Sequence, residues 1–512
     1  MNNFWKEHEK DVVIHANGKM NIVDSMERFA SDSEMKSRIA LSFEDENGKV
    51  EKYSYSELFG KVNQFANLLK EKGVKRGNKV AIFLGKCPEV YFCFLGAIKT
   101  GAIAMPLFEA FQSDGLELRL ERGDVKFLVT NKELCERYNK IEHKIKTVKE
   151  IFIIDSSDFK KSLSKQKKEF DAVLLDKMET CLMMFTSSTA GTPVAGIELP
   201  HYGLVQQVYT AKKVLLLEKG ENYWCTAHPA WVTGAIYGVV APLAIGASVF
   251  VIGGRFDSKS WIKFMKKNSI SKVYTAPTVL RLIKQDVHKG DFKQVKRLCS
   301  VGEALPQAIV DIYHKKGIDI VDTYWQTEIG SIVIANIHSK KGALGEAIGV
   351  NIAIRDGMMI IEKPWPSMMT GIYKHEKMYK DYSDGKWFKT NDLATKDKNG
   401  YFYFSGRKDD MIKTSGERVS PLEIENILLK NSVVREVAVI GIPDEVRGSI
   451  IKAFVVLNEG IEASDKLKEE LSLFVKSRYA GHAYPKIVEF VKSLPKNNAG
   501  KIVRMKLREV KK

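Results

Sequence analysis

The chain has 512 residues, more than one ordinary hydrophobic core accommodates, so we expect two or more domains. Hydrophobic residues make up 44% of it, but the apolar runs are short and interrupted and the start is charged, so we expect neither a membrane span nor a signal peptide. The formal net charge of +17 is spread along the chain without a nucleic-acid-binding signature. We therefore expect a cytoplasmic protein with no nucleic-acid partner and no membrane partner.

The N-terminal part alternates between helical and strand patterns. Ser54 and Glu57 form a capping box that begins a helix. The apolar runs at residues 80–85 and 125–130 are typical of buried parallel strands, and residues 88–101 between them favour a helix. This alternation predicts βαβ units and therefore an open α/β sheet.

The alternation continues into the middle of the chain and then gives way to shorter strands. Helices are predicted at residues 201–215 and 261–268, with strands at residues 246–252 and 272–277. From about residue 340 to 405, short strands and turns predict an antiparallel subdomain.

A smaller unit follows the polar stretch GRKDD at residues 406–410. It combines predicted helices at 421–430 and 465–479 with strands, and about a hundred residues is a plausible domain size. We predict domains at residues 1–408 and 409–512. The predicted fold class is α/β: a large N-terminal α/β domain with an antiparallel subdomain, plus a small C-terminal α+β domain.

The stretch TSSTAGTPVAGIELP at residues 186–200 is typical of a phosphate-binding loop, because it is small, hydroxyl-rich and glycine-bearing. Such loops usually carry a lysine for the phosphates, yet no lysine or arginine lies between Lys177 and Lys212. Either another residue supplies the positive charge, or the loop has lost its function.

Four further stretches are ambiguous one by one but specific in combination. They are SVGEALP at residues 300–306, DTYWQTEIGS at 322–331, the segment from Thr390 to Glu425, and PKNNAGKIVR at 495–504. Their order and spacing resemble those of the adenylate-forming enzymes, the superfamily of acyl-CoA synthetases, luciferases and peptide-synthetase adenylation domains. Within this superfamily the chain is most similar to the acetyl-CoA synthetases, and the similarity covers nearly its whole length.

The resemblance implies a two-step reaction. A carboxylate, here acetate, attacks the α-phosphate of ATP and gives an acyl-adenylate and pyrophosphate. The small C-terminal domain, which is mobile in this superfamily, then rotates, and the thiol of coenzyme A attacks the acyl group and releases AMP. Because two anions meet in the first step, the site needs cations that screen them, and Mg²⁺ is the implied cofactor.

The resemblance also implies roles for individual residues. Lys501, Glu328 and Arg418 match catalytic positions: the lysine that enters the site for adenylation, the glutamate that holds Mg²⁺ beside the phosphates, and a phosphate-facing arginine. Asp392 matches the aspartate that accepts both ribose hydroxyls, and Arg407 matches the arginine that supports it. The residues expected to bind ATP or AMP are Thr186, Ser187, Ser188, Thr189, Gly191, Gly302, Glu303, Ala304, Asp322, Thr323, Tyr324, Trp325, Gln326, Thr327, Asp392 and Arg407.

The acyl pocket carries the substrate prediction. Trp325 matches the tryptophan that floors the acetate pocket of acetyl-CoA synthetases, where a large indole leaves room only for short acids. One methylene is worth about 1–3 kcal/mol in an apolar pocket, so propionate is expected to be a slow substrate. The residues expected to line this pocket are Trp231, Val232, Thr233, Val301 and Trp325.

Three positions are expected to act in the second step. Asp409 matches the hinge of the C-terminal domain, and a hinge needs a residue that absorbs a backbone rotation. Ser415 and Gly416 match the segment that lies near the pantetheine of coenzyme A.

The phosphate loop departs from the superfamily pattern T-S-G-S-T-G-x-P-K-G. Ser188 replaces a glycine, Val194 replaces the lysine and Ala195 replaces the next glycine. The loss of one charge-assisted hydrogen bond costs about 1.5–3 kcal/mol, or roughly ten- to a hundredfold in rate if that bond forms in the transition state. Asn391, where glycine is usual, is a milder change.

Three functions stay open at this point. The favoured one is an active acetate–CoA ligase slowed by its altered loop, because the matched catalytic and pocket residues are all present together. The second is an adenylating enzyme for another small carboxylic acid or for a carrier-protein acceptor. The third is a catalytically silent nucleotide-binding homologue, supported only by the altered loop. The sequence predicts no oligomeric state.

Overall fold

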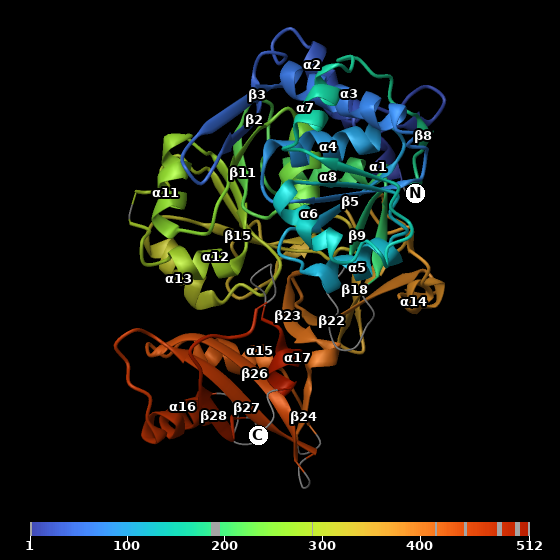
Figure 1. Cartoon of the computed structure of the whole chain (residues 1–512). Helices are drawn as coiled ribbons and strands as arrows, with labels where there is room; N and C mark the ends of the chain where they lie inside the picture. The colour runs from blue at the N-terminus through green and yellow to red at the C-terminus, as the bar shows by residue number, and fades with distance from the viewer. Residues whose placement is uncertain are drawn as a thin grey trace.

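The computed structural model describes residues 3–185, 195–288, 290–414, 417–444, 448–478, 484–496 and 502–509, with the backbone alone for residues 409, 413, 417, 418, 448 and 509. Figure 1 shows the chain from about residue 412 onward, drawn in orange-red and red, grouped below the rest of the molecule. The larger upper part contains two mixed sheets with helices around them and a smaller antiparallel sheet.

The first sheet is built from β4 (Lys79–Leu84), β5 (Ile103–Phe108), β6 (Phe127–Thr130), β7 (Glu150–Ile153), β9 (Thr180–Phe185), β10 (Gly196–Pro200) and β20 (Gly371–Ile372). Its order is β20-β10-β9-β5-β4-β6-β7, and the strands from β9 to β7 run parallel. This confirms the buried parallel strand that the apolar run at residues 80–85 predicts. β9 and β10 form an antiparallel hairpin. The predicted phosphate loop is the connection of that hairpin.

The second sheet is built from β2 (Ile39–Glu44), β3 (Val50–Ser54), β11 (Asn222–Cys225), β12 (Ser248–Ile252), β13 (Lys272–Thr275), β14 (Arg297–Ser300), β15 (Ile320–Tyr324), β16 (Ile334–Ala335) and β17 (Glu346–Ala347). Its order is β17-β16-β15-β14-β13-β11-β12-β2-β3, with a parallel centre from β15 to β2. The α/β alternation is thus divided between two sheets. Of the described strands that follow β10, only β20 returns to the first sheet, while β11 to β17 join the second. A small separate pair joins β1 (Lys19–Met20) to β8 (Leu175–Asp176).

Helices around the two sheets share one large hydrophobic core. The predicted capping box is present at the start of α3 (Tyr55–Glu71), where the side chains of Ser54 and Glu57 each accept the other residue's backbone N–H. Buried residues of α3, α4 (Pro88–Lys99) and α8 (Gly203–Lys213) join residues of both sheets in this core. Within the part of the chain that the structure describes, no helix is long and apolar enough to cross a membrane.

The other helical elements of the upper part are short. They are α1 (Asn3–His8), η1 (Glu9–Asp11), α2 (Asp24–Ser31), α5 (Ser113–Arg122), α6 (Lys132–Asn139), α7 (Ser157–Ser164), α9 (Val232–Ala235), the π-helix η2 (Ile236–Val240), α10 (Ala241–Ile245), α11 (Ser258–Lys267), α12 (Pro277–Ile283), α13 (Gln307–Lys315) and α14 (Glu376–Asp381).

The antiparallel subdomain predicted between residues 340 and 405 is present. It contains β18 (Ile352–Arg355), β19 (Met358–Glu362), β21 (Ser383–Asp384), β22 (Trp387–Lys396) and β23 (Phe402–Arg407). The order is β18-β19-β22-β21, and β23 pairs with the other part of β22. The register of β22 and β23 sets Asp392 opposite Arg407.

The C-terminal elements have a hydrophobic core of their own. β26, β27 and β28 form a sheet, with α15 and α16 packed on one face and α17 on the other. This is the α+β pattern that the sequence predicted, while the residue at which the N-terminal domain ends stays a prediction. The elements are η3 (Lys408–Asp410), β24 (Ile412–Thr414), β25 (Glu417–Val419), α15 (Pro421–Leu428), β26 (Val434–Asp444), β27 (Gly448–Leu457), α16 (Asp465–Arg478), β28 (Ile487–Phe490) and α17 (Arg504–Glu509).

Candidate active site

Two of the predicted site segments meet at the carboxyl ends of β14 and β15. Ser300 and Asp322 are register partners in these parallel strands, so the segments that follow β14 and β15, residues 301–304 and 325–328, leave the sheet at the same edge. This edge is where ligands commonly bind in α/β sheets. Gly302 has a φ of 101° and open space where a side chain would begin. Glycine therefore suits this position both by its backbone conformation and by the room it leaves for a ligand.

Glu303 and Asp322 occupy different environments within this edge. The Glu303 carboxylate accepts the Thr278 backbone N–H at 2.9 Å and Arg281 Nη2 at 2.8 Å, so α12 holds its side chain. Asp322 is 8% exposed, and its Oδ1 has no hydrogen-bond partner among the described residues. Burial, and to a smaller extent the charge of Glu303, raise the pKa of Asp322 to about 8. Burial therefore favours the protonated form of the Asp322 carboxyl in the unliganded protein.

Replacing Asp322 with asparagine is expected to stabilise the unliganded protein, and to do so most at alkaline pH. The folded pKa of about 8 exceeds the ordinary value of 3.8, so the folded state keeps a proton that the unfolded state releases. Stability is therefore lost as the pH rises from about 4 to about 8, by up to about 1.4 kcal/mol per pH unit. Asparagine has the same shape and no charge, so it removes this loss. The measurement is the melting temperature of both proteins between about pH 5 and about pH 9. A gain that does not grow with pH contradicts the burial of an ionisable group at this position.

A second group of predicted residues converges on Asp392 in β22. Tyr324 Oη donates to Asp392 Oδ2 at 2.8 Å, and Gln326 Nε2 donates to the same oxygen at 2.7 Å. Arg407 approaches from β23, with its Nε 3.6 Å from Asp392 Oδ1. Asp392 is 5% exposed. The structure thus brings together a largely buried carboxylate, a cation and two residues of the DTYWQTE segment.

The backbone before Asp392 explains why glycine is usual at the preceding position. Asn391 has a φ of 59°, in the left-handed region that asparagine enters more readily than most other residues. The pairing of β22 with β19 shifts register at this point, and Thr390 Oγ1 accepts the backbone N–H of Asp392 at 3.2 Å. Asparagine therefore preserves the local bend that positions Asp392.

Glu328 lies in the turn that follows β15. Tyr382 Oη donates to its Oε1 at 3.1 Å, and burial raises the pKa of its carboxyl. The turn requires Gly330, which has a φ of 77° and whose Cβ would lie 2.1 Å from the carbonyl oxygen of Ser367. The turn that carries Glu328 therefore depends on a glycine two residues later, at position 330.

The same turn is connected to the end of the predicted phosphate loop. The Glu328 carbonyl accepts the Met369 N–H at 3.0 Å, and the adjacent Thr370 N–H donates to the Glu198 carbonyl at 2.9 Å. Glu198 lies in β10, two residues after Gly196, where that strand begins. The exit of the phosphate loop and Glu328 are therefore linked through one short segment.

Glu328 fits a Mg²⁺ ion that also binds phosphates. Within the described ranges, no group of three or more His, Cys, Asp or Glu side chains gathers in a way that would hold a metal ion by itself. Mg²⁺ is usually bound through one or two carboxylates, with water and substrate phosphates completing its shell. A carboxylate whose charge is disfavoured by burial gains from such a cation.

The predicted floor of the acyl pocket is buried and hydrogen-bonded. Trp325 is 7% exposed, and its indole N–H donates to Tyr274 Oη at 3.1 Å. The ring of Tyr237 packs edge-on against it, with a centroid distance of 5.3 Å. Val301 belongs to the same hydrophobic cluster as Trp325, and Val232 packs against that cluster.

The remaining two pocket residues lie at the start of α9. The ring of Trp231 lies 5.5 Å from that of Phe108, at the carboxyl end of β5. The Thr233 carbonyl lies 3.9 Å from Cys225 Sγ, at the end of β11. Both residues are partly exposed, as the rim of an open pocket would be.

Part of the predicted site cannot be placed, because it lies outside the described residues. Flanking residues show only where the loops begin and end. The Ala195 side chain is buried, and Gly196 pairs with Phe185 at the base of the phosphate loop. The undescribed positions are Thr186, Ser187, Ser188, Thr189, Gly191, Val194, Ser415, Gly416 and Lys501, together with the side chains of Asp409 and Arg418.

The two ends of the loop that carries Lys501 are anchored in the C-terminal part. Lys496 and Ile502 form an antiparallel bridge that closes the loop. Lys496 Nζ pairs with Glu436 Oε2 at 2.5 Å, and Arg504 Nη2 donates to both Glu425 oxygens at 2.7 Å. The described residues on both sides of segment 497–501 therefore form a fixed base.

This base lies near the Glu303 side of the site. Burial disfavours the charged form of Arg504, but the carboxylates of Glu425, Asp410 and Glu303 outweigh burial and raise its pKa. Glu425 and Asp410 belong to the C-terminal elements, whereas Glu303 follows β14. The charge of Glu303 thus acts across the two parts of the molecule, within a few residues of Lys501.

Sequence reasoning missed the residues that hold the predicted ones in place. Tyr382 binds Glu328, Thr390 supports Asp392, and Tyr274 and Tyr237 contact Trp325. Thr390 begins one of the four stretches that the sequence singles out, but the motif does not indicate this supporting role. Tyr237, Tyr274 and Tyr382 lie outside those four stretches. Their roles depend on contacts between distant strands, and no spacing along the chain signals those contacts.

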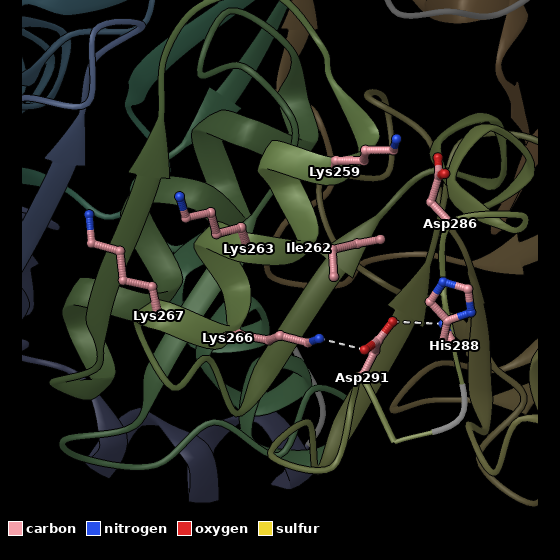
Figure 2. Close-up of a pocket in the computed structure, with 8 residues that line it drawn as sticks. All are labelled: Lys259, Ile262, Lys263, Lys266, Lys267, Asp286, His288 and Asp291. Carbon is pink, nitrogen blue, oxygen red and sulfur yellow. Dashed lines mark hydrogen bonds and ion pairs between the residues drawn. The ribbon is translucent and has the colours of Figure 1, made fainter.

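A basic hollow on α11 is separate from this site. Figure 2 shows that the amino group of Lys259 points to the opposite side from those of Lys263 and Lys267. Lys266 pairs with Asp291 at 2.5 Å, and Lys267 pairs with Glu44 at 2.9 Å. These amino groups do not converge on one point, and two of the lysines are paired with carboxylates, so the hollow is a poor phosphate-binding site. The hollow is lined by Lys259, Ile262, Lys263, Lys266, Lys267, Asp286, His288 and Asp291.

Comparison with known proteins identifies the family. The family described as AMP-binding enzyme matches residues 28–363, and the family described as AMP-binding enzyme C-terminal domain matches residues 423–501. An acetyl-coenzyme A synthetase of Bacillus subtilis (strain 168) is 39% identical over 537 residues, which cover 98% of this chain and 93% of that protein. An acetyl-coenzyme A synthetase of Methanothrix thermoacetophila is 33% identical over 543 residues, which cover 95% of this chain and 82% of that protein.

Solved structures agree with this result. An anthranilate CoA ligase in complex with anthranoyl-AMP has a TM-score of 0.88 and 25% identity, with 98% of each chain covered. A benzoate CoA ligase from Burkholderia xenovorans LB400 has a TM-score of 0.86, 96% of this chain covered and 100% of that chain covered, and at 23% identity it shows likeness of fold. The fold and the matches define an AMP-forming acid–thiol ligase, an adenylate-forming acyl-CoA ligase that uses ATP and coenzyme A. The chain belongs to the AMP-binding enzyme family, within the adenylate-forming superfamily of acyl-CoA synthetases.

Proposed function

We propose that this protein is an acetate–CoA ligase, which forms acetyl-CoA, AMP and pyrophosphate through an acetyl-adenylate. The observation that carries the proposal is the buried, hydrogen-bonded indole of Trp325, which shares a hydrophobic cluster with Val301. A fixed indole at the floor of the acyl pocket limits the depth of the pocket, so that only a short carboxylic acid fits. The relatives from Bacillus subtilis and Methanothrix thermoacetophila, both named acetyl-coenzyme A synthetase, support the same acid.

In this proposal, the carboxyl ends of β14 and β15 hold the nucleotide. Asp322 accepts the adenine amino group with its otherwise unbonded Oδ1, beside the backbone of residues 302–304. Asp392 accepts the ribose hydroxyls, while Tyr324 and Gln326 orient its carboxylate. Arg407 favours the ionised form of Asp392, which accepts hydrogen bonds only.

The first step joins two anions, so positive charge governs its rate. An acetate oxygen attacks the α-phosphorus, and the bond from that phosphorus to the bridging oxygen breaks as pyrophosphate leaves. Lys501 and Arg418 stabilise the negative charge that develops on the phosphate oxygens. Glu328 and the phosphates would hold Mg²⁺, which would supply further positive charge to screen the approaching carboxylate.

The second step needs the C-terminal part to move. We assign the hinge to Asp409, between domains at residues 1–408 and 409–512, and the pantetheine contact to Ser415 and Gly416. The thiol sulfur of coenzyme A attacks the acyl carbon, the bond to the AMP oxygen breaks, and the thiol proton passes to solvent. ATP and coenzyme A as substrates are in keeping with a cytoplasmic location.

The test is product analysis with purified protein, ATP, Mg²⁺, coenzyme A and one acid at a time. We expect acetate to give acetyl-CoA, AMP and pyrophosphate in equal amounts, with propionate slower and butyrate slower again. Acetyl-adenylate that accumulates in the presence of coenzyme A would point to another acceptor, such as a carrier protein. Nucleotide binding without pyrophosphate release from any acid would overturn the proposal.

Replacing Val194 with lysine is expected to raise the rate of adenylation roughly ten- to a hundredfold, because it restores a charge-assisted hydrogen bond worth about 1.5–3 kcal/mol. The measurement is acetate-dependent ATP–pyrophosphate exchange, with Val194→Leu as the uncharged control of greater length. An equal gain in the leucine variant would mean that side-chain size, and not charge, limits the loop. No gain with lysine would mean that another cation already occupies that role.

A further inference from the structure

Trp325 is held by a chain of hydrogen bonds through Tyr274 and Thr323, and the chemistry of the groups fixes which of them donates in each bond. An indole N–H only donates, so Tyr274 Oη is its acceptor at 3.1 Å. Thr323 Oγ1 donates its one proton to the Ser300 carbonyl at 2.7 Å. The 2.7 Å contact between Tyr274 and Thr323 therefore has the tyrosine as donor. Each hydroxyl in this chain is both a donor and an acceptor, so Tyr274 cannot turn away from Trp325 without breaking a second bond.

Tyr237 restrains the same indole from another side. Its ring lies 5.3 Å from that of Trp325 at 79° and 5.4 Å from that of Tyr274 at 88°, the edge-to-face geometry that aromatic pairs prefer. Its Oη accepts the Ile332 N–H at 2.9 Å and lies 2.9 Å from Ser331 Oγ. Tyr237 and Tyr274 are both fully buried. The three rings therefore form one packed group with fixed polar ends.

The backbone joins Tyr237 directly to the predicted wall of the acyl pocket. α9, which begins with Val232 and Thr233, passes without a break into the π-helix η2, where Tyr237 is the second residue. π-helical turns are rare and occur frequently at functional sites. A side chain at Gly234 would lie 2.0 Å from the His228 carbonyl, so glycine lets this wall pack against the preceding loop. The wall of the pocket and the residue that restrains its floor are parts of one helical segment.

We propose that Tyr274 and Tyr237 are positioning residues that set the acyl-chain length by fixing the Trp325 indole as the pocket floor. This inference rests on the proposed function, in which Trp325 closes the acyl pocket. An indole that is free to change rotamer uncovers space for further methylenes. Discrimination between short acids therefore depends on the bonds that hold the ring as well as on its size.

The test is a double-mutant cycle that is read as acid selectivity. Adenylate formation with acetate, propionate and butyrate is measured for the wild type, Tyr274→Phe, Trp325→Gly and the double variant. Tyr274→Phe keeps the ring and removes the acceptor. We expect it to lower the ratio of kcat/KM for acetate over butyrate by on the order of tenfold. In the Trp325→Gly background the same change leaves the ratio unaltered, because no indole remains to be positioned.

Tyr313→Phe is the matched control. Tyr313 is also fully buried, and its Oη donates to the Leu280 carbonyl at 2.9 Å in a separate hydrophobic cluster. Its loss is expected to lower stability without changing the acid ratio. Tyr237→Leu disturbs the indole from the other side and keeps the proposal testable if Tyr274→Phe does not fold. An equal fall for all three acids, or the same change of ratio with and without Trp325, overturns the positioning role.

The same data separate this inference from the proposed function. A wild type that prefers an acid longer than acetate contradicts the acetate assignment, while a shift of its acid profile by Tyr274→Phe still supports the positioning role. A wild type that prefers acetate, with a profile that neither tyrosine variant shifts, contradicts the positioning role alone.

Discussion

Replacing Lys501 with alanine is expected to lower the rate of acetyl-adenylate formation by about two to three orders of magnitude, the usual cost of removing one preorganised donor from a charged transition state. Transfer of the acetyl group from adenylate to coenzyme A is expected to change little. In the first step an anion attacks a phosphate that is itself anionic, so one lysine ammonium has a large effect. In the proposed second step, which follows movement of the C-terminal part, a thiol attacks a neutral carbonyl carbon. The two half-reactions are measured separately, as ATP–pyrophosphate exchange and as conversion of preformed acetyl-adenylate.

Lys506→Ala is the control for this experiment. Lys506 is exposed on α17, a few residues beyond Lys501, so its loss changes the net charge equally. We expect both half-reactions to stay near the wild-type rate in this variant. We propose a specific role for Lys501, whose described neighbours are held by the Lys496–Ile502 bridge and by the contact of Arg504 with Glu425. Equal losses in both half-reactions of Lys501→Ala would contradict that role.

Replacing Trp325 with glycine is expected to change which acid the enzyme prefers. The indole is buried between Tyr274 and Tyr237, so its removal opens space of several methylenes at the pocket floor. Each methylene that finds a place there is worth about 1–3 kcal/mol, so butyrate and longer acids gain roughly ten- to a hundredfold or more in kcat/KM. Acetate loses the contact to its methyl group and becomes a poorer substrate. The measurement is kcat/KM for linear acids from acetate upward.

Trp325→Phe is expected to have an intermediate effect on acid preference. A phenyl ring fills part of the same space and cannot donate to Tyr274, so the preferred acid is expected to lie between those of the other two proteins. Replacing a large buried aromatic side chain with a small residue lowers the free energy of unfolding by about 3–5 kcal/mol. The melting temperature of each variant is therefore measured together with its kinetics. An unchanged acid profile in a folded Trp325→Gly variant would mean that the pocket floor lies elsewhere.

Much of the fold follows from local patterns. The capping box at Ser54 begins α3, and the apolar runs near residues 80 and 127 are the parallel strands β4 and β6. The division into two sheets does not follow from such patterns. It depends on β12 pairing with β2, about two hundred residues earlier in the chain. Pairings over such distances are decided by the packing of whole layers, and periodicity within a segment carries no information about them.

The site divides in a similar way. Residues that stand inside motifs were predicted, and the structure brings Tyr324, Gln326 and Arg407 together at Asp392. The residues behind them were not predicted. Tyr274 lies in β13 and reaches Trp325, which follows β15, across the intervening strand β14. Its significance depends on the direction of a hydrogen bond. Motifs indicate the groups that touch the substrate, whereas the groups that position them become visible only through three-dimensional contacts.

The central claim is that this chain activates acetate as an adenylate before coenzyme A takes part. Its most direct test is ATP–pyrophosphate exchange by the wild-type protein with Mg²⁺ and without coenzyme A. The account predicts exchange that requires acetate, proceeds more slowly with propionate, and is absent without an acid. A protein that binds ATP but catalyses no exchange with any short acid would contradict the account.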